Sequence, residues 1–446
     1  MLTDELLRDV TPERLIRLYH QRTKMRLWVR SRLWAQVLIA MALGVLAGWL
    51  LGPAPGLVPR STAEAIGGWL ALPGQLFLGL IAIVLVPLVF SSIVGGLAAT
   101  PSSEAMRAIG LRLGLYILLS TSLAATIGVS LALAFTPGER VDVPVPAVSP
   151  LPSAVPAFDI ARLPDLVAGV LPTNPAASII QGDLLAIVIL ALLTGVAVTR
   201  IQKSKADTLL ALLDGVLSVS MTIVQWAMLL SPLAVFGLMA KLMIQVGADS
   251  LLGLVAYVGT VLLGLVLLFL GYLLLLTAVG RIGPGRFLAR AGQTLVLAFS
   301  TSSSSAVMPG TIQTARRFGV PDRVASMVVP IGATMNMAGT ALYQSVAILF
   351  LAQISGIELG SGQLLLIIGT LVASSIGAPG TPGVSMGILA SVAAGFGIPA
   401  AGLVIILGVD RLLDMSRTVV NVTGDMAASV LLKDALGDLG KSGGTT

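Results

Sequence analysis

The feature of this sequence that most constrains its fold is a series of apolar runs, several of them about 18 residues or longer, which is enough to cross a bilayer as a helix. Lipid offers the backbone no hydrogen-bond partners, so the N–H and C=O groups of such runs must bond to one another within a helix. Of the 446 residues, 56% are apolar and 11% are charged, whereas a soluble domain is about one quarter charged. The sequence therefore predicts an all-α polytopic membrane protein.

Eight transmembrane helices are expected, separated by charged or proline-rich segments. They are placed at Trp34–Leu51, Leu76–Ala99, Ile109–Phe135, Leu184–Val198, Leu209–Val246, Leu251–Val279, Val324–Leu351 and Ala400–Leu432. The fifth run is too long for one straight crossing and contains Pro232, so we expect it to tilt or kink.

The distribution of positive charge predicts the orientation in the membrane. Residues 1–32 carry eight Lys and Arg, and further basic clusters follow between alternate apolar runs, whereas the loop at 137–181 is rich in proline and poor in lysine. Because cytoplasmic loops carry the excess of Lys and Arg, both termini are expected in the cytoplasm, with the chain in the cell inner (plasma) membrane. Residues 1–33 are expected to form an amphipathic surface helix, and 438–446 a flexible tail. This placement favours lipid over nucleic acid as the partner of the basic residues.

Composition limits the chemistry that the chain is able to perform. There is no cysteine, and His20 is the single histidine. Thiolate sites are therefore excluded, and histidine-based metal centres and triads have too few ligands. An intramembrane enzyme would depend on Ser/Lys or paired-Asp chemistry, and a passive channel is a further alternative. We expect no cofactor and no enzymatic activity.

Two segments contain breaks that no single straight span explains. Residues 284–320 include LVLAFSTSSSSAVMPG, and residues 360–396 include SSIGAPGTPGVSMG. In each, two apolar arms too short to cross flank a polar or Gly/Pro break, which predicts a re-entrant helical hairpin. Irregular backbone at membrane depth is tolerated only inside protein or along a water-filled cavity. Two hairpins that enter from opposite sides predict inverted repeats, with a binding site where their tips meet.

The stretch DRLLDMSRTVVNVTGD at 410–425 concentrates charge within an apolar region. In a helix, Asp410, Asp414, Arg417, Asn421 and Asp425 fall within roughly 80° of one another, on a stripe about 20 Å long. Buried charges are costly unless paired, and ionisable groups inside membranes usually serve function. We interpret the stripe as a site for a charged substrate and a cation; an ion-pair ladder that only locks helices together is the alternative.

Two further polar stretches are expected to line the same site. In ATMNMAGTALYQ, the residues Thr334, Asn336, Gly339 and Thr340 interrupt the seventh span, and unwinding there would free carbonyl oxygens for a hard monovalent cation. The run Ser300–Ser305 would form a hairpin tip whose N–H groups and hydroxyls hold a carboxylate.

These motifs together resemble the dicarboxylate/amino acid:cation symporter family, also called the glutamate transporter family. The likeness runs from about residue 34 to 437 and rests on SSSSAVMP, NMAGTALYQ, SIGAPGTPG and DRLLDMSRTVVNVTGD, with VLPTNP at 170–175. It implies a homotrimer with an elevator mechanism, in which a transport domain slides past a fixed scaffold. The implied domains are scaffold helices 1 and 2 at 34–107, transport-domain helix 3 at 108–136, an extracellular loop with scaffold helices 4 and 5 at 137–250, and the rest of the transport domain at 251–437.

The resemblance also implies roles for individual residues, with aspartate or glutamate as substrate and sodium as the co-transported ion. For the substrate these are Ser304 and Asn421 on the α-carboxylate, Asp414, Thr418 and the carbonyls of Ser302 and Thr381 on the ammonium, and Arg417 and Thr340 on the side-chain carboxylate. For sodium they are Asp425 with the backbone oxygens of Gly332, Asn336 and Asn421; the backbone oxygens of Thr334, Ser375, Ile376 and Ala378; and Ser120 and Thr121 with Asn336.

One position departs from the family pattern, which usually has an aspartate where this chain has Ala338. The third cation site thereby loses its formal anion, which leaves stoichiometry and the choice between sodium and proton open. Asp414, Arg417 and Asp425 are all retained. An acid at 414 would repel succinate, which has no ammonium, so aspartate or glutamate is favoured. A C4-dicarboxylate symporter and a proton-coupled acidic amino acid symporter are the alternatives.

Overall fold

The computed structural model describes residues 33–52, 57–98, 104–141, 174, 184–247, 250–376, 384–399 and 402–433. Four predicted features lie wholly or mostly outside the described residues: the surface helix at 1–33, of which only Leu33 is described, most of the 137–181 loop, the tip of the second hairpin at 377–383, and the tail at 438–446. Within the described ranges every regular element is a helix and none is a strand, which confirms the all-α prediction.

The helices follow the apolar pattern of the sequence, with some extended and some divided. Their bounds are α3 Leu33–Leu51, α4 Arg60–Ala98, α5 Glu104–Phe135, the 3-10 helix η1 Pro137–Arg140, α8 Leu184–Val198, α9 Lys203–Val246, α10 Ser250–Ala278, α11 Pro284–Thr301, α12 Ser304–Arg317, α13 Asp322–Met335, α14 Ala338–Ile354, α15 Ser361–Ile376, α16 Val384–Gly395 and α17 Leu403–Leu431.

Several of these helices are long and apolar enough to cross a membrane. In the part of the chain that the structure describes, five qualify by length and composition: Arg60–Ala98, Ile109–Arg140, Lys203–Gln245, Gly253–Ala278 and Asp322–Ile354. Shorter apolar helices and α17, which is 29 residues long but carries five charged side chains, accompany them. The protein is thus built as a multi-pass membrane protein, while the count of eight spans stays a prediction.

Two of the long helices differ from their predicted extents. α4 begins at Arg60, well before the expected start at Leu76, and stays helical through Pro73 and Pro87. α9 begins at Lys203 rather than at the expected Leu209, and it also stays helical through Pro232. Proline removes one backbone hydrogen bond, and packing against neighbouring helices compensates for that loss.

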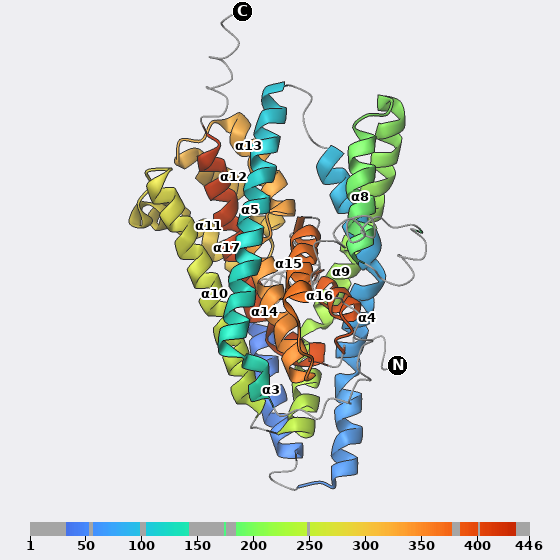
Figure 1. Ribbon diagram of the computed structural model, residues 1–446. Helices are drawn as coiled ribbons and strands as arrows, with labels where there is room; N and C mark the ends of the chain where they lie inside the picture. Colours follow the sequence, from blue (N-terminus) through green and yellow to red (C-terminus); the bar gives the residue numbers. More distant parts are fainter. Residues whose placement is uncertain are drawn as a thin grey trace, which may run out of the picture.

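The helices pack in two sets. α3, α4, α8 and α9 pack against one another, whereas α5, α10, α14 and α17 form a second set with α11, α12 and α13. In Figure 1, α4, α8 and α9 lie on one side of the molecule and α10 and α11 on the other, with α14, α15 and α16 between them. The assignment of these sets to a scaffold and a transport domain stays a prediction, as does their relative movement.

Glycines allow the first set of helices to approach closely. A Cβ on Gly237 of α9 would overlap the backbone carbonyl of Leu70 in α4, and a Cβ on Gly48 of α3 would overlap the carbonyl of Ala240 in α9. Small residues at helix contacts are typical of membrane proteins, where backbone approach replaces the hydrophobic effect as the source of packing energy.

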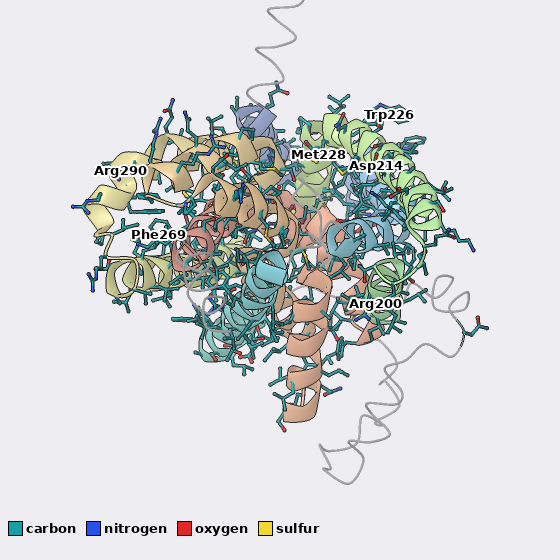
Figure 2. The ribbon with its side chains drawn as sticks, turned by 90° about the horizontal axis from the view of Figure 1, so that it is seen from above. Arg200, Asp214, Trp226, Met228, Phe269 and Arg290 are labelled. Carbon is teal, nitrogen blue, oxygen red and sulfur yellow. The ribbon has the colours of Figure 1, made fainter. Side chains whose placement is uncertain are left out.

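The outside of the helices is apolar. Trp69, Trp226 and Leu274 are 77%, 60% and 71% exposed. Figure 2 shows Trp226 on the outer side of α9, far from Arg290 on the opposite side of the molecule. Exposed apolar area on this scale is unusual for a protein surrounded by water, and lipid is the solvent that suits it.

α11 and α12 form an antiparallel helical hairpin. The rings of Phe287 and Phe318 stack with centroids 5.6 Å apart, and the hydroxyls of Thr294 and Thr314 are 2.9 Å apart. The turn is at Ser302, whose φ of 52° places it in the left-handed region. Two helices thus meet at a tight turn in the serine run, as the sequence indicates. The re-entry of this segment into a membrane stays a prediction.

The close contact between α4 and α9 gives a stability prediction. Gly237→Ala should reduce stability by about 1–3 kcal/mol, because the new methyl group overpacks the interface. Thermal unfolding of the detergent-solubilised protein measures the change as a lower midpoint.

Gly215→Ala is the matched control, because it lies in the same helix with no atom within 4 Å of the added Cβ. It should be neutral or slightly stabilising, since alanine favours helix over glycine. Equal midpoints for the two variants would contradict the role of Gly237 in packing.

Candidate functional site

The polar stripe of the sequence lies on α17, which packs against α10, α11, α12, α13 and α14. The charged and polar side chains of the stripe and its edge are buried, each at most 8% exposed; they are Asp410, Arg411, Asp414, Arg417, Thr418, Asn421 and Asp425. The predicted helix with one dense polar face is therefore confirmed, and that face is enclosed by protein.

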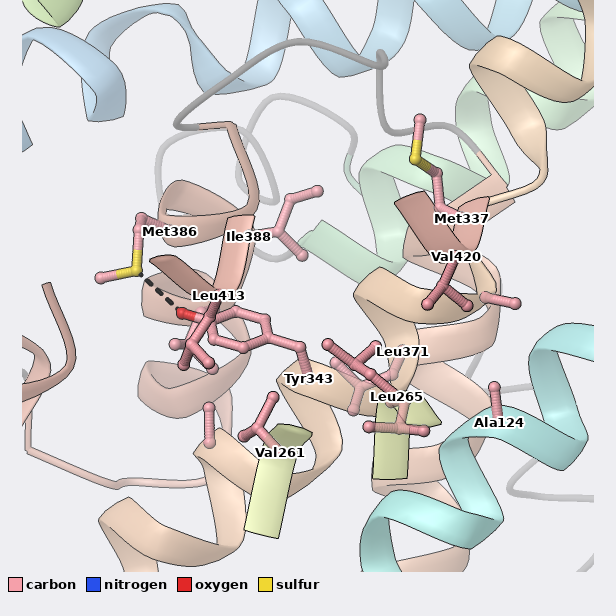
Figure 3. Packing of buried hydrophobic residues seen from close by; sticks show 14 of the residues in the cluster. Ala124, Val261, Leu265, Met337, Tyr343, Leu371, Met386, Ile388, Leu413 and Val420 are labelled. Carbon is pink, nitrogen blue, oxygen red and sulfur yellow. Dashed lines mark hydrogen bonds between the residues drawn. The ribbon is translucent and has the colours of Figure 1, made fainter. Parts of the chain in front are cut away.

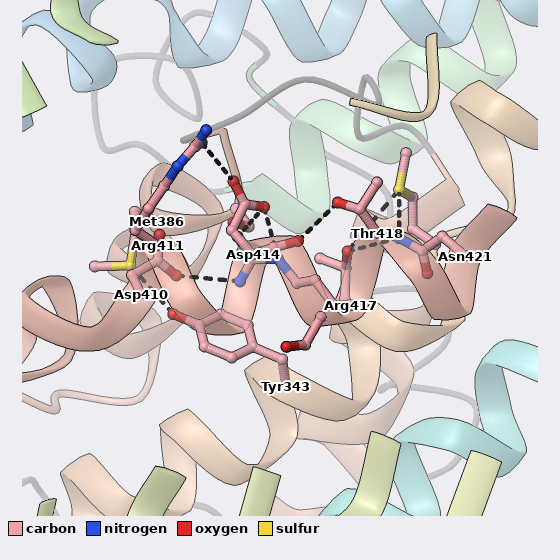
Figure 4. A network of polar contacts seen from close by, with 12 residues as sticks. Tyr343, Met386, Asp410, Arg411, Asp414, Arg417, Thr418 and Asn421 are labelled. Carbon is pink, nitrogen blue, oxygen red and sulfur yellow. Dashed lines mark hydrogen bonds and ion pairs between the residues drawn. The ribbon is translucent and has the colours of Figure 1, made fainter. Parts of the chain in front are cut away.

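Arg417 is the centre of the stripe. Its Nε and Nη2 lie 3.0 Å and 2.8 Å from Oδ1 of Asp414, and its Nη1 donates to Oδ1 of Asp410 at 3.1 Å. Nη2 also donates to the hydroxyl of Ser385 in α16. The guanidinium carbon lies 4.2 Å from the centroid of the Tyr343 ring, a cation–π contact. Figure 4 shows this arrangement.

Asp414 contacts a second arginine. Nη1 of Arg411 lies 3.6 Å from Oδ2 of Asp414, on the other side of the carboxylate from Arg417. Together with Asp410, these groups form a cluster of two carboxylates and two guanidiniums with no net charge. Removing one partner from such a cluster would leave a buried charge uncompensated, at a cost of about 3–5 kcal/mol.

The next turn of α17 connects the stripe to α14. The side-chain carbonyl of Asn421 accepts from the N–H of Gly339 at 2.8 Å, and its amide donates to the Thr340 hydroxyl at 3.2 Å. A Cβ on Gly339 would lie 2.9 Å from the carbonyl oxygen of Arg417, so only glycine allows this approach. Thr418 donates to the backbone carbonyl of Asp414 at 2.7 Å.

The predicted interruption of the seventh span is present but shorter than expected. Asn336 and Met337 alone separate α13 from α14, whereas Thr334, Gly339 and Thr340 are helical. The Thr334 hydroxyl donates to the carbonyl of Ile331 one turn earlier, at 3.0 Å, so the side chain is satisfied within α13. The break falls where the side chain of Asn336 turns toward α17.

Oxygen atoms gather around Asn336. Its amide donates to Oδ1 of Asp425 at 2.9 Å, and the Ser120 hydroxyl of α5 lies 3.5 Å from its side-chain oxygen. Thr121 follows Ser120 in α5, and its hydroxyl is buried with no hydrogen-bond partner among the described residues, Asn336 included. A Cβ on Gly332 would lie 2.5 Å from Oδ1 of Asp425, so the carboxylate abuts the α13 backbone. Uncharged and anionic oxygens in this arrangement suit a hard monovalent cation.

Two tyrosines that sequence reasoning missed adjoin this oxygen cluster. The Tyr116 hydroxyl donates to the carbonyl of Gly424 at 3.0 Å. The Tyr272 hydroxyl is buried, and a Cβ on Gly424 would lie 3.0 Å from it. A polar hydroxyl within an apolar span was the signal that could have found them, although the span of Tyr272 also contains Tyr257.

Sequence reasoning also missed residues of α14 and α16. Tyr343 and Ser385 contact Arg417, and Gln344 contacts Ser385. Tyr343 lies among buried hydrophobic side chains and donates from its hydroxyl to Sδ of Met386 at 3.2 Å (Figure 3). The Gln344 amide donates to the carbonyl of Ser385 at 3.2 Å, and its side-chain oxygen has no described partner. Tyr343 and Gln344 belong to the motif NMAGTALYQ, so the motif itself was the signal for them.

The remaining predicted residues are placed as follows. Ser302, Ser304 and Ser375 are buried, and the hydroxyls of Ser302 and Ser375 lack partners in the described part of the chain. Both arms of the serine hairpin pack on α17, and α15, which ends at Ile376, contacts α13. Thr381 and Ala378 lie outside the described residues. The structure thus brings the serine hairpin, the α13–α14 break and α16 together around α17.

Comparison with known proteins relates this site to transporters. The chain is 32% identical to the proton/sodium-glutamate symport protein of Bacillus subtilis (strain 168), over 91% of this chain and 92% of the relative. It is 31% identical to the proton/glutamate-aspartate symporter of Escherichia coli (strain K12), over 89% and 91%. It is 30% identical to the C4-dicarboxylate transport protein of Deinococcus deserti, over 90% and 88%. The sequence model of the sodium:dicarboxylate symporter family matches residues 33–435, so the chain belongs to this family of transporters and is not an enzyme.

Proposed function

We propose that the protein is a secondary active symporter of acidic amino acids, aspartate or glutamate, driven by co-transported cations, with sodium favoured. It works as an elevator in a homotrimer of the inner (plasma) membrane, with eight spans, two re-entrant hairpins and both termini in the cytoplasm. Two of the relatives are named for glutamate or glutamate and aspartate, with protons or sodium as coupling ions, which supports this class of substrate.

The observation that carries the proposal is the buried Asp414–Arg417 pair beside Asn421 and Thr340. A zwitterionic diacid presents one ammonium and two carboxylates. Asp414 matches the ammonium, and the guanidinium of Arg417 offers a bidentate fork to a carboxylate. The hydroxyl and amide groups of the next turn supply neutral donors for the other carboxylate. One face of one helix thus carries a partner for each end of the substrate.

Binding at this pair is an exchange of partners. Arg417 is held by Asp410 and Asp414 in the structure, so its charge is compensated before substrate arrives. The side-chain carboxylate of the substrate would replace Asp414 at the guanidinium, and its ammonium would then take Asp414. Because every charge keeps a partner, the exchange avoids the cost of a bare buried ion.

The oxygen cluster around Asn336 and Asp425 is the proposed cation site, with Ser120 and Thr121 from α5. Ala338 begins α14 and is fully buried, at a position where an acid would add a fixed negative charge next to this cluster. Because alanine has no carboxylate, Asp425 is the acidic residue that the described part of the chain places beside Asn336. This supports a weaker sodium requirement than an acid at 338 would give.

Uptake of labelled aspartate into proteoliposomes tests the proposed function, with sodium and pH gradients imposed separately. An inward cation gradient should drive accumulation above the equilibrium level, and dissipating that gradient should abolish it. Current without accumulation would indicate a channel, and no aspartate transport under either gradient would overturn the proposal.

Arg417→Cys should reduce aspartate affinity at least about 100-fold, because the substrate carboxylate loses its bidentate partner. Binding is measured by the concentration of aspartate that half-saturates uptake. Arg286→Cys is the control, since Arg286 is exposed on α11. Size-exclusion chromatography reports whether each variant remains folded; unchanged aspartate affinity in a folded Arg417→Cys protein would refute the assigned role.

Ala338→Asp should strengthen the sodium dependence of uptake, because a buried carboxylate is stabilised by a bound cation. The sodium concentration that half-saturates aspartate uptake should fall by about tenfold, which corresponds to roughly 1.4 kcal/mol. Ala338→Asn provides a side chain of the same size without the charge and should show a smaller change. An identical sodium response in all three proteins counts against the missing-anion interpretation.

A further inference from the structure

Arg411 is a buried cation with few partners. Its side chain is 8% exposed, and its contact with Asp414 is an ion pair of 3.6 Å, longer than a hydrogen bond. Its Nε and Nη1 atoms donate to no acceptor among the described residues. A guanidinium has five N–H donors and is always charged, so such a position is costly unless the charge itself is needed.

The charge of Arg411 acts on one carboxylate. Oδ1 of Asp414 faces Arg417, and Oδ2 faces Arg411, so the carboxylate lies between two guanidiniums (Figure 4). In the proposed transport cycle, the substrate carboxylate takes Arg417 and the substrate ammonium takes Asp414. Arg411 therefore already occupies the side of Asp414 that faces away from Arg417, with the same charge as that ammonium.

The contact between Arg411 and Asp414 changes the expectation for a diacid without an ammonium, which the sequence alone predicts to be repelled by Asp414. With Arg417 engaged by a substrate carboxylate, Asp414 alone would be a bare anion that repels succinate. With Arg411 beside it, Asp414 keeps a counterion and the repulsion is compensated. Both arginines of the cluster thus count toward the binding of a dicarboxylate.

We propose that Arg411 is a specificity-determining residue that substitutes for the ammonium of the substrate, so that four-carbon dicarboxylates such as succinate bind at the same site as aspartate. This inference rests on the proposed function and names a second substrate class for it. The proposed role predicts opposite effects of Arg411 on the two substrates, whereas a purely structural role predicts the same effect on both. Arg411 supports succinate, but it competes with the aspartate ammonium for Asp414.

The test is Arg411→Ala in proteoliposomes, with unlabelled succinate competing against labelled aspartate and with labelled succinate uptake measured in parallel. In the unsubstituted protein succinate should compete. In the variant, the succinate concentration for half-inhibition should rise at least about tenfold, because Asp414 is left bare. The concentration of aspartate that half-saturates uptake should fall or stay the same, because the ammonium no longer has a competitor.

Two variants accompany this test. Arg411→Lys retains the positive charge and should retain competition by succinate. Arg286→Ala removes an exposed arginine of α11 and should change the affinity for neither aspartate nor succinate. If Arg411→Ala does not fold, Arg411→Gln removes the charge while keeping a long polar side chain, and the same shift in the ratio of the two affinities is expected.

The outcomes separate the two proposals. Aspartate transport without any competition by succinate, or an unchanged ratio of affinities in the folded variants, would overturn the inference while the proposed function stands. Parallel losses of aspartate and succinate in a folded variant would also overturn it, because they indicate a structural role. Transport of succinate alone would overturn the proposed function, and transport of neither substrate would overturn both.

Discussion

The compensation of charge on α17 is the constraint around which the rest of the structure is arranged. Asp410, Arg411, Asp414 and Arg417 are buried together, and any one of them alone would be an uncompensated charge in a protein surrounded by lipid. The helix supplies the spacing, since residues three, four and seven apart share a face. Other elements then complete the coordination of Arg417, with the Ser385 hydroxyl from α16 and the Tyr343 ring from α14.

The backbone is irregular at a place where side chains of α17 supply hydrogen-bond partners. The two-residue break between α13 and α14 faces Asn421, which accepts from the N–H of Gly339, while the side chain of Asn336 donates to Asp425. Such a break would be unfavourable against lipid, where freed polar groups find no partners. Because Asn336 also lies near Ser120 of α5, the same break joins the polar stripe to the oxygen cluster of the proposed cation site. Substrate and cation would thereby bind to one connected network.

Local sequence predicted the elements that are marked by several polar or charged residues in an apolar run. It failed for features that depend on contacts between distant helices. The stripe on α17, the turn at Ser302 and the break at Asn336 follow from charge spacing and from small polar residues in apolar runs. The early start of α4 could not be predicted, because Gly67, Gly68 and Pro73 disfavour a helix locally and packing on α9 overrides them. The partners of Arg417 in α14 and α16 depend on how distant helices meet. The periodicity of the sequence does not predict how these helices pack, although Tyr343, which contacts Arg417, lies within the motif NMAGTALYQ.

Charge balance connects the substrate to the coupling ions. The five charged groups of α17 are three carboxylates and two guanidiniums, which leaves a net charge of −1. A bound aspartate adds one negative charge, so two monovalent cations would neutralise the loaded site; an acid at position 338 would require one more. Moving an uncompensated charge through the low-dielectric interior is costly, so a carrier is favoured to move with its site close to neutral. Succinate carries one more negative charge than aspartate. If Arg411 admits it, that charge must be matched by an additional cation or proton, or its transport must respond more steeply to the membrane potential than that of aspartate.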